Sequence, residues 1–102
     1  MDSCLFCKIV NKEIPATIVY EDDNVLAFED IAPVAPIHIL IIPKKHIATI
    51  ADLTGEDAAI SADLMKTAAK VAKEKGLDGY RVVANCGEKA GQTVLHVHFH
   101  LL

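Results

Sequence analysis

The fold of this chain is decided by the stretch GQTVLHVHFHLL at positions 91–102. From Leu95 onward, apolar residues alternate strictly with histidines, and a period of two is the pattern of a β-strand with one buried face. The apolar face belongs to a core, and the opposite face carries imidazoles. Residues two apart on a strand lie about 6.5 to 7 Å apart, so the rings can serve one small anionic or metal centre. The histidine face consists of His96, His98 and His100.

The loop before this strand carries groups that suit phosphate oxygens. It runs from Asn85 to Thr93 and offers two glycines, whose backbones can approach a ligand closely, then an amide and a hydroxyl. Such a loop alone is more often a plain turn than a phosphate cradle. Joined to three aligned histidines, it indicates a phosphate site. A metal site and a solvent-facing strand that carries histidines by chance are the alternatives.

The rest of the chain predicts short elements in the order helix, hairpin, strand, helix and two strands. The longest helix begins at Thr54, whose hydroxyl lies three residues before Asp57 as in a capping box, and ends at Gly76. We therefore expect an α+β fold with an antiparallel sheet of about five strands, one long helix and one short N-terminal helix. The short helix is expected within residues 1–12, and the strands at 17–21, 25–29, 37–42, 80–85 and from 94 or 95 to 101.

Composition excludes several classes of protein. The chain has 102 residues, 52% hydrophobic and 24% charged, which is typical of one globular domain, here 1–102. Its formal net charge of −4 has the wrong sign for holding nucleic acid through phosphate contacts. The longest apolar stretch, 31–42, is too short to span a membrane. No secretory signal pattern opens the chain, so we expect a cytoplasmic protein without nucleic-acid or membrane partners.

The chain resembles the histidine triad (HIT) family, in its Hint-like nucleotide-binding branch. The segment at 91–102 matches the family pattern of alternating histidines followed by two apolar residues. Further matches are LF at 5–6, KEIPA at 12–16, FEDI at 28–31, PIH at 36–38 and IPKKH at 42–46. The resemblance covers essentially the whole chain and implies the HIT-like fold.

This resemblance implies a hydrolase that attacks the α-phosphorus of a purine nucleoside phosphoramidate. His98 is the implied nucleophile, and water hydrolyses the nucleotidyl-histidine intermediate. A neutral imidazole suits this role near pH 7, and we expect a backbone carbonyl to hold its other nitrogen. His38 and His100 are implied to complete the proton network, although His38 also fits a satisfied core histidine. The alternatives are a dinucleoside polyphosphate hydrolase or nucleotidyl transferase, and a non-catalytic nucleotide- or zinc-binding module.

The resemblance also implies a nucleotide-binding set. Asp30 and Asn85 are implied to hold the ribose hydroxyls, although Asp30 also fits a turn after a strand. Thr93 stands where the family commonly has serine, and it is implied to hold phosphate oxygens together with the backbone amides near Gly91 and Gln92. An apolar base pocket implies purine recognition by shape, for nucleotides of the AMP or GMP type. Its walls are Leu5, Phe6, Ile9, Phe28 and Ile31.

The motif CLFC at positions 4–7 is a separate signal. Cys4 and Cys7 supply half of a tetrahedral zinc site. Relatives with this pair resemble zinc proteins whose other ligands correspond to His46 and His96, so a structural zinc is implied, with no cofactor needed for the chemical step. Cys86 is then a free thiol. The resemblance further implies a homodimer, for which the long helix and the strand at 80–85 offer apolar surface.

Overall fold

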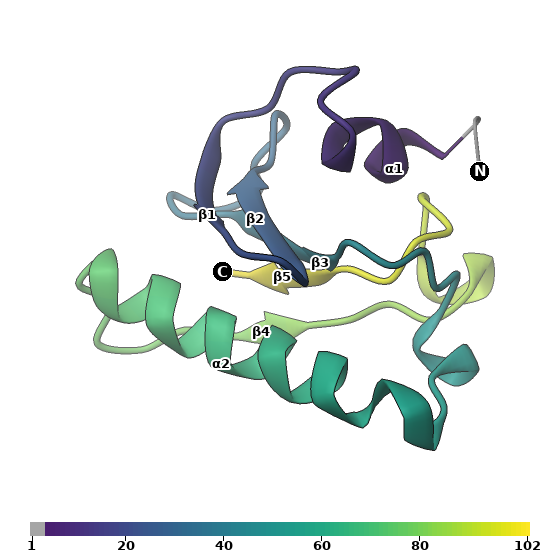
Figure 1. Ribbon diagram of the computed structural model, residues 1–102. Coiled ribbons are helices and arrows are strands. Elements are labelled where there is room, and N and C mark those ends of the chain that lie inside the picture. The colour runs from purple at the N-terminus through teal and green to yellow at the C-terminus, as the bar shows by residue number, and fades with distance from the viewer. Residues whose placement is uncertain (1–3) are drawn as a thin grey trace.

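The computed structural model describes residues 4–102 and has one antiparallel sheet in the strand order β1-β2-β3-β5-β4 (Figure 1). The strands are β1 (Ile18–Glu21), β2 (Val25–Glu29), β3 (Ile39–Pro43), β4 (Val82–Val83) and β5 (Phe99–Leu101). The α-helices of this part of the chain are α1 (Leu5–Val10) and α2 (Ala58–Glu74). The predicted α+β fold is therefore confirmed. The first part of the expected N-terminal helix, residues 1–3, lies outside the described residues.

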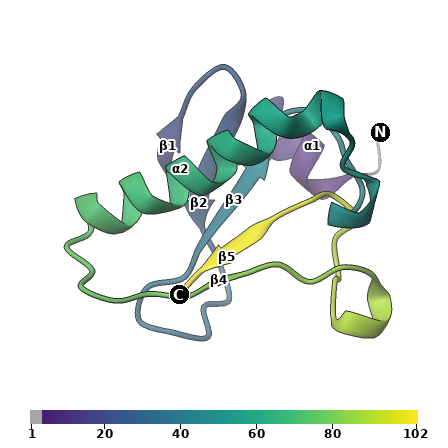
Figure 2. The same ribbon diagram turned by 90° about the horizontal axis from the view of Figure 1, so that it is seen from below.

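The two helices lie on opposite faces of the sheet (Figures 1 and 2). Side chains alternate across a strand, so β2 and β3 present one apolar set to each helix. The set that faces α2 packs against Leu64, Ala68, Val71 and Ala72, and comprises Val25, Ala27, Ile39 and Ile41. The set that faces α1 packs against Phe6 and Ile9, and comprises Leu26, Phe28, Leu40 and Ile42. Both central strands are thus buried on both faces.

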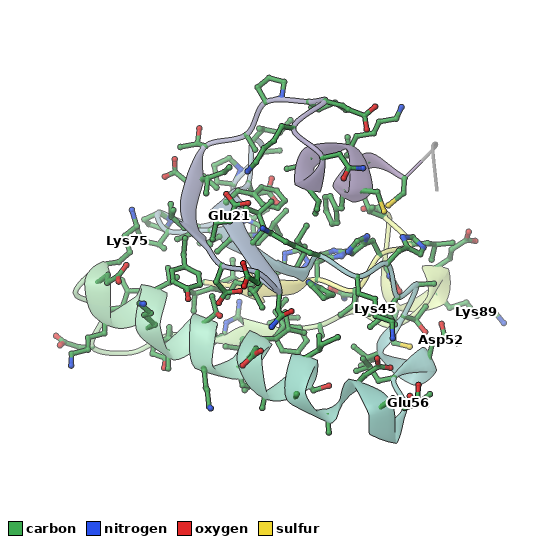
Figure 3. All side chains as sticks on the ribbon, in the orientation of Figure 1. Glu21, Lys45, Asp52, Glu56, Lys75 and Lys89 are labelled. Carbon is green, nitrogen blue, oxygen red and sulfur yellow. The ribbon has the colours of Figure 1, made fainter. Side chains whose placement is uncertain are left out.

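Helix α2 has the predicted start and stop signals. The backbone N–H and the hydroxyl of Thr54 both donate to Asp57 Oδ2, at 3.0 and 3.2 Å, and one 3₁₀ turn precedes the α-helix. Lys45 Nζ lies 2.8 Å from the other oxygen of Asp57, which is buried. Gly76 follows the last turn with a φ of 70°, the left-handed conformation that glycine adopts most readily. Charged side chains such as Glu56, Lys75 and Lys89 lie on the outside of the molecule (Figure 3).

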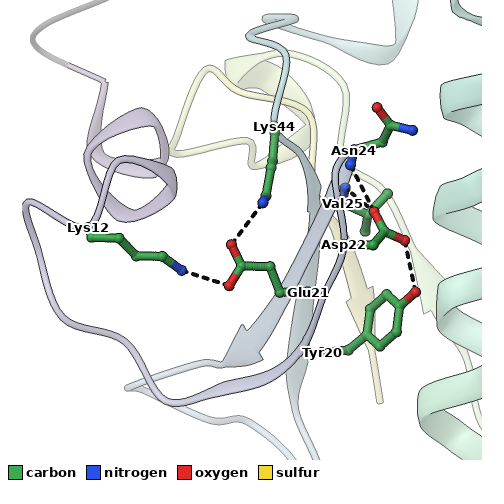
Figure 4. A network of polar contacts seen from close by, with 7 residues as sticks. All are labelled: Lys12, Tyr20, Glu21, Asp22, Asn24, Val25 and Lys44. Carbon is green, nitrogen blue, oxygen red and sulfur yellow. Dashed lines mark hydrogen bonds and ion pairs between the residues drawn. The ribbon is translucent and has the colours of Figure 1, made fainter.

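The hairpin between β1 and β2 is closed by polar contacts around two acids (Figure 4). Asp22 Oδ1 accepts the backbone N–H groups of Asn24 and Val25 at 2.8 and 2.9 Å, which is an Asx-type turn. Glu21 lies between Lys12 and Lys44, each with Nζ 2.8 Å from one of its oxygens. These ion pairs connect the segment after α1 to β1 and to the end of β3.

Strand β1 begins at Ile18 instead of 17, and β3 runs over Ile39–Pro43 instead of 37–42; two other strands are much shorter than the sequence predicts. The strand expected at 80–85 is limited to Val82–Val83, and the strand expected from 94 or 95 is limited to Phe99–Leu101. The ladder between β3 and β5 ends where Ile41 faces Phe99. Before that point, Val97 N–H donates to Ile47 O instead, and Leu95 is 49% exposed rather than in the core. The expected alternation therefore starts at Val97. Within the described residues, no helix is long and apolar enough to cross a membrane.

Candidate functional site

Three histidine rings lie in a row on the α1 face of the sheet. The ring centroids of His98 and His100 are 5.0 Å apart, and those of His100 and His38 are 5.1 Å apart. His100 lies opposite Leu40 in the β3–β5 register, and His38 directly precedes β3. The structure thus brings together the three residues for which the family resemblance implied a catalytic role, although 62 positions separate His38 from His100.

The ring of His98 is held in one orientation. Its Nδ1 lies 2.8 Å from the backbone carbonyl oxygen of His96, so Nδ1 carries the proton and donates it to that carbonyl. The edge of Phe6 packs against the ring at a centroid distance of 5.0 Å. Nε2 consequently keeps its lone pair, and the ring lines a cavity. This is the carbonyl partner that we expected for a nucleophilic imidazole.

Hydrogen bonds also set the tautomers of the other two rings. Val34 N–H donates to His38 Nδ1 at 3.2 Å, so His38 carries its proton on Nε2. That Nε2–H donates to His100 Nδ1 at 2.9 Å, and His100 is then protonated on Nε2. Burial lowers the pKa of His100, and the neighbouring rings of His98 and His38 lower it further, so a neutral ring is favoured. Asp30 Oδ2 lies 3.4 Å from His38 Nε2.

Asp30, His38 and His100 have donor atoms close enough together to hold a metal ion. The proton positions argue against that use. A metal on His38 Nε2 would force the proton onto Nδ1, where it would meet the N–H of Val34. These three side chains therefore suit a proton-transfer network better than a metal centre.

A cavity of about 260 Å³ opens beside His98. Nine of the predicted nucleotide-binding residues line it: Leu5, Phe6, Ile9, Phe28, Asp30, Ile31, Thr93, His98 and His100. Six further residues line it that the sequence did not assign to the nucleotide site: Ile14, Pro15, Ala16, Glu29, Leu40 and Val94. The walls are mostly apolar, with a small number of polar groups from Glu29, Asp30, Thr93, His98 and His100, which is the usual composition of a small-molecule pocket.

Asn85, Gly91 and Gln92 do not line this cavity. Asn85 Nδ2 donates to Ala90 O at 2.7 Å, within its own loop. The backbone N–H groups of Gly91 and Gln92 donate to Glu88 O and Gly87 O, both at 3.0 Å. The amides implied to bind phosphate are therefore already engaged in the turn.

The side chain of Gln92 stabilises the loop through hydrogen bonds instead of facing the cavity. It is only 3% exposed, its Oε1 accepts Gly87 N–H at 2.8 Å, and its Nε2 donates to Ala48 O and Val94 O. Among residues 4–102, the backbone N–H groups of Thr93 and Val94 have no protein acceptor. These two amides adjoin the cavity and are the donors left for a phosphate.

Asp30 fulfils the turn role that its local sequence suggested, and it also reaches the cavity. Its Oδ1 accepts Ala32 N–H at 2.8 Å, and its backbone N–H donates to His38 O at 3.0 Å. The second oxygen, Oδ2, is directed to His38. Side-chain exposure of 20% leaves this carboxylate accessible to a ligand on one side.

The donor atoms of the four predicted zinc ligands lie close together. Cys4 Sγ lies 3.5 Å from His96 Nδ1, and Cys7 Sγ lies 3.6 Å from His96 Nδ1 and 3.3 Å from His46 Nδ1. Zinc bonds of about 2.3 Å to sulfur and about 2.0 to 2.1 Å to nitrogen, at tetrahedral angles, place S and N about 3.5 Å apart. All four donor atoms lie within 4.8 Å of one another. The cluster of Cys4, Cys7, His46 and His96 therefore fits one zinc ion with tetrahedral coordination.

The protonation state of His96 also suits a metal. His96 Nε2 donates to Pro43 O at 2.8 Å, which leaves Nδ1 free to bind an ion, and burial lowers the pKa of the ring so that it stays neutral. Burial, followed by the neighbouring Cys4 thiol, raises the pKa of Cys7 to about 11. A bound cation would reverse that preference, because the thiolate is the form that ligates metals.

Comparison with known proteins gives a consistent result. The model of the HIT domain family matches residues 11–102. An uncharacterized HIT-like protein of Synechococcus elongatus is 51% identical over 102 residues, covering 99% of this chain and 90% of that protein. The crystal structure of a HIT family hydrolase from Legionella pneumophila is similar with a TM-score of 0.96 at 55% identity, covering 98% of this chain and 91% of that one. A histidine triad nucleotide-binding protein from Candida albicans is similar at 39% identity with a TM-score of 0.89, covering 97% and 73%.

Proposed function

The chain belongs to the HIT family, and we propose that it is a hydrolase of purine nucleoside phosphoramidates that works through a nucleotidyl-histidine intermediate on His98. The observation that carries the proposal is the orientation of His98, whose Nδ1–H is held by His96 O while Nε2 borders the cavity. Relatives of solved structure are named HIT family hydrolases, and one is named a nucleotide-binding protein.

The chemistry balances in two steps. In the first, His98 Nε2 attacks the α-phosphorus, a nitrogen–phosphorus bond to His98 forms, and the bond to the leaving amine breaks. The leaving nitrogen takes a proton. In the second step water attacks the same phosphorus and gives a proton to the base that protonated the leaving nitrogen. The nitrogen–phosphorus bond to His98 breaks, which releases the nucleoside monophosphate and restores His98. We assign the proton transfers to His100, because its Nε2–H has no acceptor among the described residues and its Nδ1 is held by His38.

The cavity supports binding of one nucleotide. The base would lie between Phe6, Phe28 and Ile9, and the ribose hydroxyls would donate to the accessible oxygen of Asp30. Phosphate oxygens would accept from Thr93 and from the free amides of Thr93 and Val94, which replace the amides of Gly91 and Gln92 in the assignment made from the sequence.

We propose that the cluster of Cys4, Cys7, His46 and His96 holds a structural zinc ion. The support is the tetrahedral spacing of its donor atoms and the Nε2–H of His96 on Pro43 O. None of these four side chains takes part in the chemical steps above, which need no metal.

The function is tested with a substrate panel. Purified protein is incubated with adenosine and guanosine phosphoramidates, with diadenosine polyphosphates and with a nucleotide sugar, and the release of nucleoside monophosphate is measured. We expect the phosphoramidates to be hydrolysed with the highest kcat/KM. A preference for either of the other substrate classes would replace the proposed substrate, and binding of AMP without turnover of any of them would make the protein a binding module.

Asp30→Asn tests the ribose assignment. The amide keeps the size of the side chain but can accept from only one hydroxyl on that side, so kcat/KM for an adenosine phosphoramidate is expected to fall about tenfold to a hundredfold. The ratio of kcat/KM between the ribonucleotide and its 2′,3′-dideoxy analogue should shrink by the same factor, because the analogue makes no such bond. An unchanged ratio would contradict the assignment.

We also propose a homodimer. Met65 on α2 and Tyr80 before β4 are large apolar side chains that remain 53% and 44% exposed, on the elements that the sequence suggested for the interface. Sedimentation at micromolar concentration is expected to give twice the chain mass of 11.0 kDa. Met65→Lys is expected to shift the equilibrium toward the monomer, and a monomeric wild-type protein would contradict the proposal.

A further inference from the structure

We propose that the metal cluster and the nucleotide cavity are energetically coupled through α1, so that a zinc ion held by Cys4, Cys7, His46 and His96 raises the affinity of the cavity for a nucleoside monophosphate. This inference rests on the proposed function. It goes beyond it by giving the cluster a regulatory role: metal occupancy would set how well the cavity binds its ligand.

The first observation is that α1 belongs to both sites. Cys4 caps the helix and Cys7 lies within it, and their sulfur atoms face His96 and His46. Phe6 and Ile9 of the same helix are buried and line the cavity. The helix has only six residues, so its backbone is not stable alone and depends on the contacts that hold it to the sheet.

The contacts that hold α1 fall into three kinds. The exposed ion pair between Lys12 and Glu21 follows the helix and contributes little, because such pairs are screened by water. The apolar contacts of Phe6 and Ile9 involve Phe28 and Leu40, which line the cavity, and Leu26 and Ile42, which do not. The cluster adds an anchor of a different kind, because Cys4 and Cys7 of α1 would be joined to His46 and His96 through a metal ion. Losing the metal would leave α1 held by apolar packing and one exposed ion pair.

The second observation is that His96 and Phe6 connect the cluster to His98. The side chain of His96 enters the cluster while its carbonyl holds His98 Nδ1 at 2.8 Å. The ring of Phe6 packs edge-on against both imidazoles, with centroid distances of 5.9 Å to His96 and 5.0 Å to His98. A shift of α1 would therefore displace both the base wall and a ring that packs on the proposed nucleophile.

Coupling of this kind is reciprocal. If zinc raises the affinity for AMP by some factor, AMP must raise the affinity for zinc by the same factor. Typical couplings between two sites change affinity by about 5-fold to 150-fold, and we expect about tenfold here, because the apolar contacts of Phe6 and Ile9 remain when the metal leaves.

The experiment measures AMP binding by calorimetry in zinc-loaded protein and in protein stripped with a chelator. We expect about tenfold weaker binding in the stripped protein, restored on adding zinc. Amide hydrogen exchange over residues 5–10 should be faster in the stripped form. Cys4→Ser is the informative variant, because serine is a good N-cap and preserves the start of α1 while it removes a thiolate ligand. Its AMP affinity should equal that of stripped wild type and should not respond to zinc.

Two matched controls separate the anchor from general effects. Cys86→Ser removes a thiol outside the cluster, and Lys12→Ala removes the exposed ion pair beside α1; both should keep the full zinc response. If the stripped protein unfolds, which circular dichroism would report, the reciprocal measurement applies to folded protein: zinc affinity against a competing chelator, with and without saturating AMP, should differ by the same factor.

Equal AMP affinity in loaded and stripped protein, or equal zinc affinity with and without AMP, would overturn the coupling while leaving the proposed function intact. A failure of the zinc-loaded protein to bind AMP at all would overturn the coupling and the nucleotide site together. The two failures are therefore distinguishable from the same set of titrations.

Discussion

His98→Ala is expected to lower kcat for hydrolysis of an adenosine phosphoramidate by at least about a thousandfold, because no other group can form the covalent intermediate in its place. Nδ1 of His98 is fixed on His96 O, and the neighbouring ring of His100 has its Nδ1 occupied by His38 and its Nε2 protonated. The ring of His100 therefore presents no free lone pair to the cavity. The measurement is steady-state hydrolysis followed by release of AMP.

His98→Ala should lower the rate of the chemical step without weakening nucleotide binding. The base and ribose contacts of Phe6, Phe28 and Asp30 remain, so AMP affinity of His98→Ala should stay within a few fold of wild type. In wild-type protein quenched during turnover, mass spectrometry should find the nucleotidyl group on the peptide that contains His98. His100→Ala is the comparison variant, with a smaller expected loss of about a hundredfold to ten-thousandfold. More than about a tenth of wild-type turnover in His98→Ala would refute a nucleophilic role.

Local sequence patterns predicted most of the fold, because each pattern depends only on residues that are close together in the sequence. The capping box at Thr54 and the apolar stripe of α2 are both present in the structure. The predicted start of β5 was wrong. Its pairing with β3 ends where Ile41 faces Phe99, although β3 itself continues to Pro43, and Val97 N–H donates to Ile47 O instead of continuing the ladder.

The candidate site was predictable to the extent that family resemblance supplied the long-range partners. The spacing of Cys4 and Cys7 indicated half of a metal cluster, but His46 and His96 lie 39 and 89 residues from Cys7, and no local pattern joins them. Gln92 illustrates the opposite case. Its place in a glycine-rich loop suggested a ligand contact, whereas its buried amide bonds Ala48 O, 44 residues away. A hydrogen bond to a distant carbonyl leaves no sign in the sequence.

Cys7→Ser is expected to abolish stable zinc binding. Cys7 Sγ lies within 3.6 Å of both His46 Nδ1 and His96 Nδ1, so its removal leaves the site with three of its four ligands. A serine hydroxyl is a poor ligand for zinc compared with a thiolate. Wild-type protein purified without added metal should contain about one equivalent of zinc per chain, and the variant less than about a tenth, by elemental analysis.

The free energy of unfolding should depend on zinc binding. A ligand that binds only the folded state at a thousand times its Kd stabilises that state by about 4 kcal/mol, so zinc-saturated wild type should lose about that much free energy of unfolding when the ligand set is broken. Cys86→Ser is the matched control, because it removes a half-buried thiol of the same chain outside the cluster, and it should keep both the zinc and the stability. Full zinc occupancy in Cys7→Ser, or a metal-free wild type with unchanged stability on adding zinc, would show that these four side chains are packed together without serving a metal. In that case the coupling to the cavity would lose its basis as well, since α1 would be held by its apolar contacts alone.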